Sequence, residues 1–507
     1  MRRLVIALIV VAGLIAAVYG AATYVLGSGV VRSSIERQLA DRLGEPVHIA
    51  SAGASIFPRV ALNLRGVTIG EPAAITLGSV RVVTGLRGLL SRTIENAEVV
   101  VSDSRITLPL PMPMLSGLSA PSSAPASGFS ITSIRVISLR DVEVDVGRQT
   151  WRVDADSSLE GDRLQVKRLT LRGARTRMSA SGQLTSVARS EGQFDVHADP
   201  LDVDEVIAMA ASAKASAGSA NASAARASAG RPTLMHIVVN ATAPRGTFGA
   251  YAFRDLAATT TLQSGSTQVS PLTVSMYGGR FQGRLDADTA GAVPRLTLSG
   301  RLDGVDVAQV MKAASLGDAM TGRLGARLSL KAAGSEASAL MRSAGGTIEA
   351  SVVDGRIPHL DLVRTLVLAF GKPSGAPPAG SGSAFSRLAG TLALAGGTLT
   401  FDALTLDSRD VDLQGRGTLR LAGGRLDAHA DVLLSRALTA QAGTDLRRYA
   451  QQDGRVILPV VVGGTLEHPV VTVDLAAAGR RALENELKRK ARSLLDRLIG
   501  KKGPGVQ

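Results

Sequence analysis

The stretch LTFDALTLDSRDVDLQGRGTL, residues 399–419, decides the fold class. Leu399 and Phe401 share one face of an extended chain, and Leu404 and Leu406 form a similar pair after a two-residue step. Apolar residues that alternate with polar ones are typical of a half-buried β-strand. A polar turn and a second strand that closes on Gly-x-Leu follow, so the stretch predicts two strands joined by a turn.

The same form recurs elsewhere in the chain. Residues 164–184 read LQVKRLTLRGARTRMSASGQL and residues 267–285 read TQVSPLTVSMYGGRFQGRL, and a further pair of similar segments lies near Val203 and Val307. Repeats of a supersecondary unit build an elongated stack in which each unit contacts its neighbours. The spacing between these repeats is irregular, which is typical of a diverged repeat. We therefore expect an elongated, mainly β body.

The composition limits the classes of function. The chain has 507 residues, of which 45% are apolar, 20% are charged and 55 are glycine. Aromatic residues make up only 3%, which argues against a single-strand nucleic-acid binder, because such proteins stack bases on aromatic rings. There is no cysteine, so disulfides, thiolate chemistry and cysteine-type zinc sites are excluded. The formal net charge of +14 suits an anionic partner, either nucleic acid or an anionic lipid surface.

The N-terminus indicates where the chain resides. Residues 4–26 carry no charge and match the roughly 20 residues that a helix needs to cross a bilayer. Arg2 and Arg3 precede them, so the positive-inside rule places the N-terminus in the cytoplasm and the body in the periplasm, which argues against a nucleic-acid partner. A signal peptide cleaved near Ala21 and a buried core helix are the alternatives. The residues expected to anchor the chain in the bacterial inner membrane, in a single pass, are Leu4, Val5, Ile6, Leu8, Ile9, Val10, Val11, Leu14, Ile15, Val18, Val25 and Leu26.

Two further helices are expected, one at each end of the body. Val31, Ile35, Leu39 and Leu43 recur every four residues and predict a short amphipathic helix at the membrane exit. Near the C-terminus an apolar stripe runs along a helix rich in Arg and Lys. This basic amphipathic helix either lies on a membrane or packs its stripe on the end of the sheet. The stripe consists of Leu483, Leu487, Ala491, Leu494 and Leu498.

Three stretches poor in bulky apolar residues predict loops or linkers, at 111–128, 208–232 and 371–384. The second of them is expected to begin as a helix over residues 203–213. The predicted divisions of the chain are 1–28 (cytoplasmic tip and anchor), 29–207 (N-terminal β region), 208–232 (Ala/Ser linker), 233–370 (central β repeat region), 371–384 (Gly/Pro/Ser loop), 385–475 (C-terminal β region) and 476–507 (basic helix and tail).

One face of the predicted sheet is apolar and must be covered by a second sheet, by helices or by acyl chains. The predicted helices are too few to cover so many strands, and the aromatic residues that usually fill a sandwich core are scarce. A groove that holds lipid and a closed sandwich or barrel core remain the two interpretations. The residues expected to line a lipid groove are Val60, Leu62, Leu64, Leu164, Val166, Leu169, Leu171, Leu399, Phe401, Leu404, Leu406, Val460 and Val462.

The sequence shows no pattern of catalytic or metal-binding residues. It contains no Gly-x-Ser-x-Gly elbow, phosphate loop or dinucleotide fingerprint. The densest acidic groups, around Asp303 and Asp407, lack the glycine that fixes an EF-hand loop and are interpreted as solvated turn carboxylates. We therefore expect no enzymatic activity, no metal site and no cofactor. The six histidines are scattered without i, i+4 pairing: His48, His197, His236, His359, His429 and His468.

The order of these segments resembles a known family. The single anchor and exit helix are followed by LGEPVHIASAGASIFPRVALNLRGVTIG, then by GGTIEASVVDGRIPHLDL, and then by FSRLAGTLALAGGTLTFDALTLDSRDVDLQGRGTLRLAGGRLDAHADV. ILPVVVGGTLEHPVVTVDL precedes the basic final helix. In this order they are similar to AsmA family proteins, over nearly the whole chain outside the three linkers.

The resemblance implies a fold and a function. The fold would be an elongated, curved, antiparallel β-sheet with an apolar groove, related to the bridge-like lipid transfer proteins. The function would be to bind or transfer phospholipids between the inner and outer membranes in support of outer-membrane biogenesis, with other envelope proteins as further partners. A structural or chaperone-like factor for outer-membrane protein assembly is the alternative, and a hydrolase with residues assembled only in three dimensions is the third.

Overall fold

The computed structural model describes the chain in segments. The predicted anchor and residues 111–128 lie outside the described residues, as do residues 211–232 and 371–377 of the other two predicted linkers. None of the described helices is long and apolar enough to cross a membrane. Between residues 32 and 40, the described residues are helical and belong to the predicted exit helix. The described residues are 32–33, 36–37, 39–40, 44–55, 60–83, 93–94, 96–108, 130–131, 134–147, 149–210, 235–369, 378–441 and 450–499.

The described chain is mainly β, as predicted. Twenty-four strands belong to one open, mixed sheet, and a second sheet contains only two strands. The chain divides into two units, Met1–Gly249 with Asp255–Gln268 and Ala250–Arg254 with Val269–Gln507, which are described separately. This division falls inside the predicted central region and not at a predicted linker.

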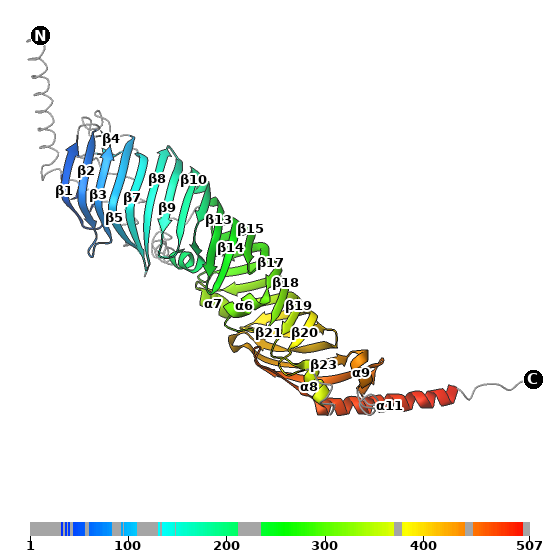
Figure 1. Cartoon of the computed structure of the whole chain (residues 1–507). Coiled ribbons are helices and arrows are strands. Elements are labelled where there is room, and N and C mark those ends of the chain that lie inside the picture. The colour runs from blue at the N-terminus through cyan, green and yellow to red at the C-terminus, as the bar shows by residue number, and fades with distance from the viewer. Residues whose placement is uncertain are drawn as a thin grey trace, which may run out of the picture. The chain divides into compact units, whose positions relative to one another are not determined.

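The first unit contains the strands up to β13 (Figure 1). The strands β14 (Tyr251–Gln263) and β15 (Ser266–Met276) contain residues of both units. The bounds in the first unit are β1 (Val47–Ser55), β2 (Ala61–Ile69), β3 (Ile75–Val83), β4 (Thr93–Ile94), β5 (Ala97–Leu108), β6 (Ser130–Ile131), β7 (Ile134–Val146), β8 (Gln149–Glu160), β9 (Arg163–Arg172), β10 (Arg177–Ser186), β11 (Glu191–Ala198), β12 (Leu201–Asp202) and β13 (His236–Phe248).

In its described residues, the second unit combines strands with five short helical segments and one long helix, α11. Its helices are α6 (Val307–Ala313), α7 (Ala337–Ser343), α8 (Leu362–Ala369), η2 (Ala422–Gly424), α9 (Arg436–Gln441) and α11 (Leu475–Ile499). Its strands are β16 (Gly279–Asp288), β17 (Arg295–Asp306), β18 (Thr321–Ala333), β19 (Gly345–Ile357), β20 (Ser383–Ala395), β21 (Thr398–Asp407), β22 (Val411–Arg420), β23 (Arg425–Leu434), β24 (Gln451–Gln452), β25 (Arg455–Gly464) and β26 (Pro469–Val473).

The sheet is not antiparallel throughout, so that part of the prediction is wrong. The strands β5 and β7 pair in parallel, and so do β11 and β13. Parallel neighbours need a crossover of a dozen or more residues. Two of the predicted linkers, 111–128 and 208–232, lie in these two crossovers. The sequence therefore located the long connections but not the change of strand direction that they allow.

Two helices of the second unit, α6 and α11, begin directly after strands on aspartate caps. Asp306 ends β17, and its side chain accepts a hydrogen bond from the backbone nitrogen of Ala308 at 3.0 Å. Asp474 precedes α11 and accepts from the backbone nitrogen of Ala477 at 2.9 Å. A carboxylate at this position satisfies backbone N–H groups that have no partner in the first helical turn. The predicted basic C-terminal helix is thus present as α11, and residues 203–210 are helical as expected.

One predicted boundary needs correction. The strand β20 begins at Ser383, so the last two residues of the predicted 371–384 loop belong to the sheet. The Ser383 hydroxyl accepts a hydrogen bond from the backbone nitrogen of Leu362 at 3.0 Å. This bond joins the start of α8 to the start of β20. It gives the polar side chain of Ser383 a partner inside the strand.

Candidate functional site

The apolar face of the sheet is built by strand register. Along β22 no irregularity interrupts the pairing with β23, so alternate residues of β22 point to one side. Paired residues of neighbouring strands also share a side. Partners on β22 therefore place all four apolar residues of the deciding stretch on one face: Leu399 pairs with Leu419, Phe401 with Gly417, Leu404 with Gly415 and Leu406 with Leu413.

A β-bulge explains the two-residue step in that stretch. The pairing between β21 and β22 shifts between Phe401 and Leu404, so the extra residue keeps both side chains on the same face. The same step occurs in β9 between Val166 and Leu169, opposite Gly182 and Ala180 of β10. Repeats that resemble one another in sequence thus share a bulge that keeps their apolar residues aligned.

In β2 the corresponding step falls on Gly66, between Leu64 and Val67. Gly66 has a φ of +62°, and a Cβ atom there would lie 2.8 Å from the Cβ of Ala50. Both the backbone conformation and the space therefore require glycine. Leu64 and Val67 contact the same apolar cluster as Ile49. The sheet thus uses a left-handed glycine in β2 where β9 and β21 use an inserted residue.

Part of this apolar face is only half buried. Within the described chain, the sole other sheet pairs β4 with β6, so no second sheet of comparable size packs on it. The closed sandwich is therefore not what the structure shows. We call the half-buried residues the open strip: Leu164, Val166, Leu169 and Leu171 on β9 in the first unit, and Leu328, Ile348, Leu392, Leu399 and Leu404 in the second unit.

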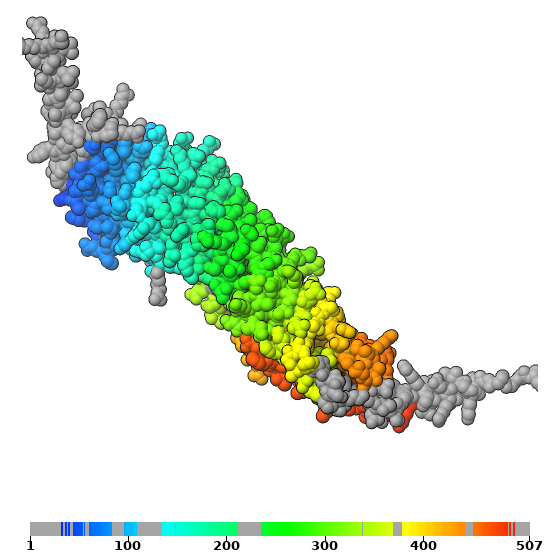
Figure 2. All heavy atoms as spheres, viewed as in Figure 1, coloured from blue at the N-terminus to red at the C-terminus, as the bar shows by residue number. Residues whose placement is uncertain are grey.

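Within each unit, the open strip continues onto neighbouring strands. In the second unit, Leu328, Ile348 and Leu392 pair side by side on β18, β19 and β20. In the first unit, Leu164 and Leu171 on β9 pair with Leu184 and Met178 on β10. In Figure 2 the heavy atoms of the first unit, coloured by residue number, pack closely over neighbouring strands. At these positions, each apolar side chain is therefore paired with another apolar side chain on the neighbouring strand.

Helices cover another part of the apolar face. Leu362 and Leu366 of α8 are each 1% exposed and pack in one cluster with Val432 and Val460. Val307 of α6 contributes to a second cluster. Sequence analysis assigned no helix to α8, although Leu362 and Leu366 stand four residues apart in it. The cover of the C-terminal strands by α8 was therefore missed.

The predicted groove residues accordingly divide into two groups. Val460, at 1% exposure, lies in the protein core formed with α8 and does not face an open surface. Leu406, at 4%, lies in the cluster that includes Val307 of α6. The buried group consists of Val60, Leu64, Phe401, Leu406 and Val460, and the half-buried group consists of Leu62, Leu164, Val166, Leu169, Leu171, Leu399, Leu404 and Val462.

The polar face is held by ion pairs between strands. Arg105 on β5 pairs with Glu143 on β7, and Arg152 on β8 pairs with the same carboxylate at 3.1 Å. Arg105 lowers the pKa of Glu143 through a hydrogen bond, with Arg152 contributing next. These partners are far apart in sequence, so they were not predicted. They place paired opposite charges on the face opposite the open strip.

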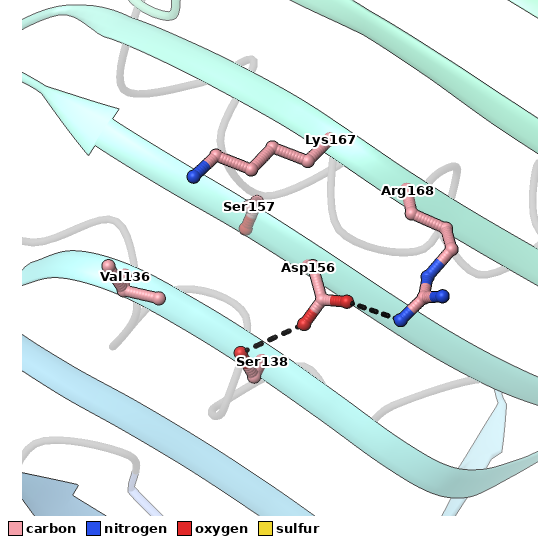
Figure 3. Close-up of a pocket in the computed structure, with 6 residues that line it drawn as sticks. All are labelled: Val136, Ser138, Asp156, Ser157, Lys167 and Arg168. Carbon is pink, nitrogen blue, oxygen red and sulfur yellow. Dashed lines mark hydrogen bonds and ion pairs between the residues drawn. The ribbon is translucent and has the colours of Figure 1, made fainter.

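A small open pocket on the polar face likewise contains a carboxylate that is paired with arginine side chains of neighbouring strands (Figure 3). Asp156 accepts hydrogen bonds from Ser138 at 3.1 Å and from Arg168 at 2.9 Å. Arg140 is the main cause that lowers the pKa of Asp156 to about 2. The carboxylate is already paired with two guanidinium groups, so the arrangement stabilises the strands and offers no free acid or base. The pocket is lined by Val136, Ser138, Asp156, Ser157, Lys167 and Arg168.

Replacing Asp156 with asparagine should lower the free energy of unfolding by about 1 kcal/mol at neutral pH, since it removes a partly exposed charged network. The lowered pKa means that Asp156 contributes stability above about pH 4 and that this contribution is lost as the pH falls toward 2. Thermal unfolding of the wild type and the variant should therefore differ at neutral pH and converge near pH 2. Asp402→Asn, at an exposed position on β21, serves as the control. A constant difference across this range would contradict the assignment.

Two of the scattered histidines meet in the fold. The rings of His359 and His468 stack with centroids 5.7 Å apart, and His359 Nε2 lies 2.8 Å from Asp318 Oδ1. This hydrogen bond lowers the pKa of Asp318. In the described part of the chain, no group of three or more His, Cys, Asp or Glu residues is placed to hold a metal ion. The histidine pair therefore joins loops of the second unit.

The AsmA family model matches residues 152–404. The chain belongs to the AsmA family. The match in this AsmA protein runs from β8 to β21 and includes the open strip of β9 and of β18 to β21. This matched range of residues is shorter than the range of the sequence resemblance, which extends to both ends of the chain. No curated protein and no solved structure matches the chain.

Proposed function

We propose that this AsmA family protein is anchored in the bacterial inner membrane and binds or transfers phospholipid on the open strip of a periplasmic sheet. The observation that carries the proposal is the open strip itself. Its leucines are half buried, and the only other sheet in the described residues has two strands. Apolar surface left in contact with water costs about 25 cal/mol per Å², so an apolar ligand that covers it gains that free energy.

Acyl chains fit this surface better than a folded partner does. The strip is made of Leu, Ile and Val, and glycines such as Gly390 and Gly415 stand beside Leu404 in the neighbouring strands. Such a surface has few polar groups to fix one orientation, which suits flexible hydrocarbon. The uncharged residues 4–26 and the preceding arginines support the membrane anchor and periplasmic side.

The protein is proposed to act without enzymatic activity, cofactor or bound nucleic acid. The support for this is chemical: the sequence contains no nucleophile or cofactor motif, and the paired carboxylates of the polar face are neutralised by arginine. Family membership is consistent with an envelope role that involves lipid or protein. The alternative to lipid binding is contact with outer-membrane assembly proteins. The photo-crosslinking experiment described next distinguishes these two functions.

Photo-crosslinking separates the two. A crosslinking residue at Leu399 or Leu164 should label phospholipid in cells, because these side chains belong to the open strip. The matched controls are Thr400 and Gln165, the next residue in each strand, whose side chains are exposed on the opposite face. At Val460 the residue should crosslink only to protein, because this side chain is buried with α8. Phospholipid labelling absent from both strip positions, with a protein adduct in its place, would favour the assembly factor.

A further inference from the structure

The C-terminal helix α11 exposes two leucines of its predicted apolar stripe. Leu483 and Leu487 lie about one turn apart, and their side chains are 64% and 59% exposed. Leu475, at the start of the helix, is 80% exposed. Large apolar side chains that remain exposed at helical spacing mark an interaction surface. Of the two interpretations that the sequence left open, packing of the stripe on the sheet does not occur at these residues.

A different side of the helix is fastened to the sheet. Arg481 donates hydrogen bonds to both carboxylate oxygens of Asp431 on β23, at 2.9 and 2.8 Å. Arg481 and Leu483 are two positions apart, so their side chains diverge by about 200° around the helix axis. The ion pair therefore holds the first turns in place while the leucines face away from this contact.

The charge of α11 indicates the chemistry of what covers the stripe. Arg and Lys outnumber Asp and Glu in the helix by seven to three, and Lys501 and Lys502 follow it. In sequence, Ala491, Leu494 and Leu498 continue the spacing of Leu483 and Leu487. A helix with leucines along one side and an excess of cations matches the interface of a bilayer that carries anionic headgroups.

We propose that α11 lies on the surface of a bilayer containing anionic phospholipid, with Leu483 and Leu487 inserted at the boundary between headgroups and acyl chains. Asp431 and Arg481 orient the helix for this contact by holding its first turns against β23. The proposal is independent of lipid binding on the open strip, because attachment of the helix to a surface requires no lipid to leave that surface.

The test uses the full chain in nanodiscs of neutral phosphatidylcholine, so that the N-terminal apolar segment is already occupied. Sucrose-loaded vesicles of phosphatidylcholine and phosphatidylglycerol in equal parts are added and sedimented. Wild-type protein should sediment with these vesicles and remain in solution with vesicles of phosphatidylcholine alone. The double variant Leu483→Asp, Leu487→Asp should bind at least ~10-fold more weakly, because two carboxylates replace the inserted side chains.

Val470→Asp is the matched control, since Val470 on β26 is also apolar and 57% exposed but lies outside α11. It should bind as the wild type does, and all three proteins should unfold at the same temperature because the replaced side chains are exposed. Equal binding by the double variant and the wild type would overturn the proposal. So would a wild-type protein that sediments with neither kind of vesicle, and that result would assign the stripe to a protein partner.

Discussion

Leu406→Asp should destabilise the second unit by about 4 kcal/mol, whereas Leu404→Asp, two residues earlier on the same face, should leave the protein folded. Leu406 is 4% exposed and packs with Val307, Val352 and Phe385. A carboxylate there would be removed from water without a cationic partner. Leu404 belongs to the open strip, so a carboxylate at this position keeps access to water and should cost about 1 to 2 kcal/mol of lost apolar contact.

Lipid content should change in the opposite order. A charge at position 404 lies on the surface proposed to hold acyl chains, so Leu404→Asp protein purified from membranes should carry less phospholipid than the wild type. Urea unfolding and mass spectrometry of extracted lipid measure the two effects. Thr400→Asp, at an exposed position on the opposite face of the same strand, controls for the charge itself. If Leu404→Asp unfolded as readily as Leu406→Asp, the strip would be a protein core and the proposed function would fail.

Deletion of single residues should show whether the bulge sets the strand register, and with it the face on which the apolar side chains lie. Removal of Ala403 takes one residue from the bulge of β21 and restores one-to-one pairing with β20 and β22. Leu404 and Leu406 then keep their face, and the cost should be about 1 kcal/mol. The free energy of unfolding reports this directly.

The matched deletion is Gln414 in β22, which pairs regularly with β23. Loss of this residue moves Asp412 into the place of Leu413 or Arg416 into the place of Gly415, because a one-residue shift turns each side chain to the other face. Gly415 has the Cβ of Ala430 within 3.1 Å of where its own Cβ would be, so an arginine there is crowded as well as charged. We expect this deletion to cost at least 3 kcal/mol more than deletion of Ala403. Similar costs for both deletions would show that the bulge does not set the register.

Local alternation was enough to predict the sheet and the residues of one face. In the stretch around Leu399 and Leu404, the period of two and the two-residue step are both visible in sequence, and the bulge confirms that the two pairs belong together. The C-terminal helix could be predicted for the same reason, since its leucines recur every four residues. These features depend on neighbours within about ten positions.

Features that depend on distant residues were not predicted. Val460 resembles Leu399 in its surroundings in sequence, but α8 covers it from a segment about 95 residues earlier in the chain. The parallel pairing of β5 with β7 and the ion pair of Arg105 with Glu143 likewise need the register between separate strands. Alternation identifies the face to which a side chain belongs, and only the packed helices decide whether that face is open.

The bulged hairpin affects how the length of such a chain can change during evolution. Residues 164–184 and 399–419 each form an antiparallel hairpin, so the chain enters and leaves at the same end of the two strands. Each hairpin also contains its own bulge. Duplication of a segment of this size inserts two strands, widens the sheet by about 10 Å, and leaves the direction of every later strand unchanged. Gene duplication can therefore produce longer or shorter relatives in steps of one hairpin, with no new core to be evolved at each step.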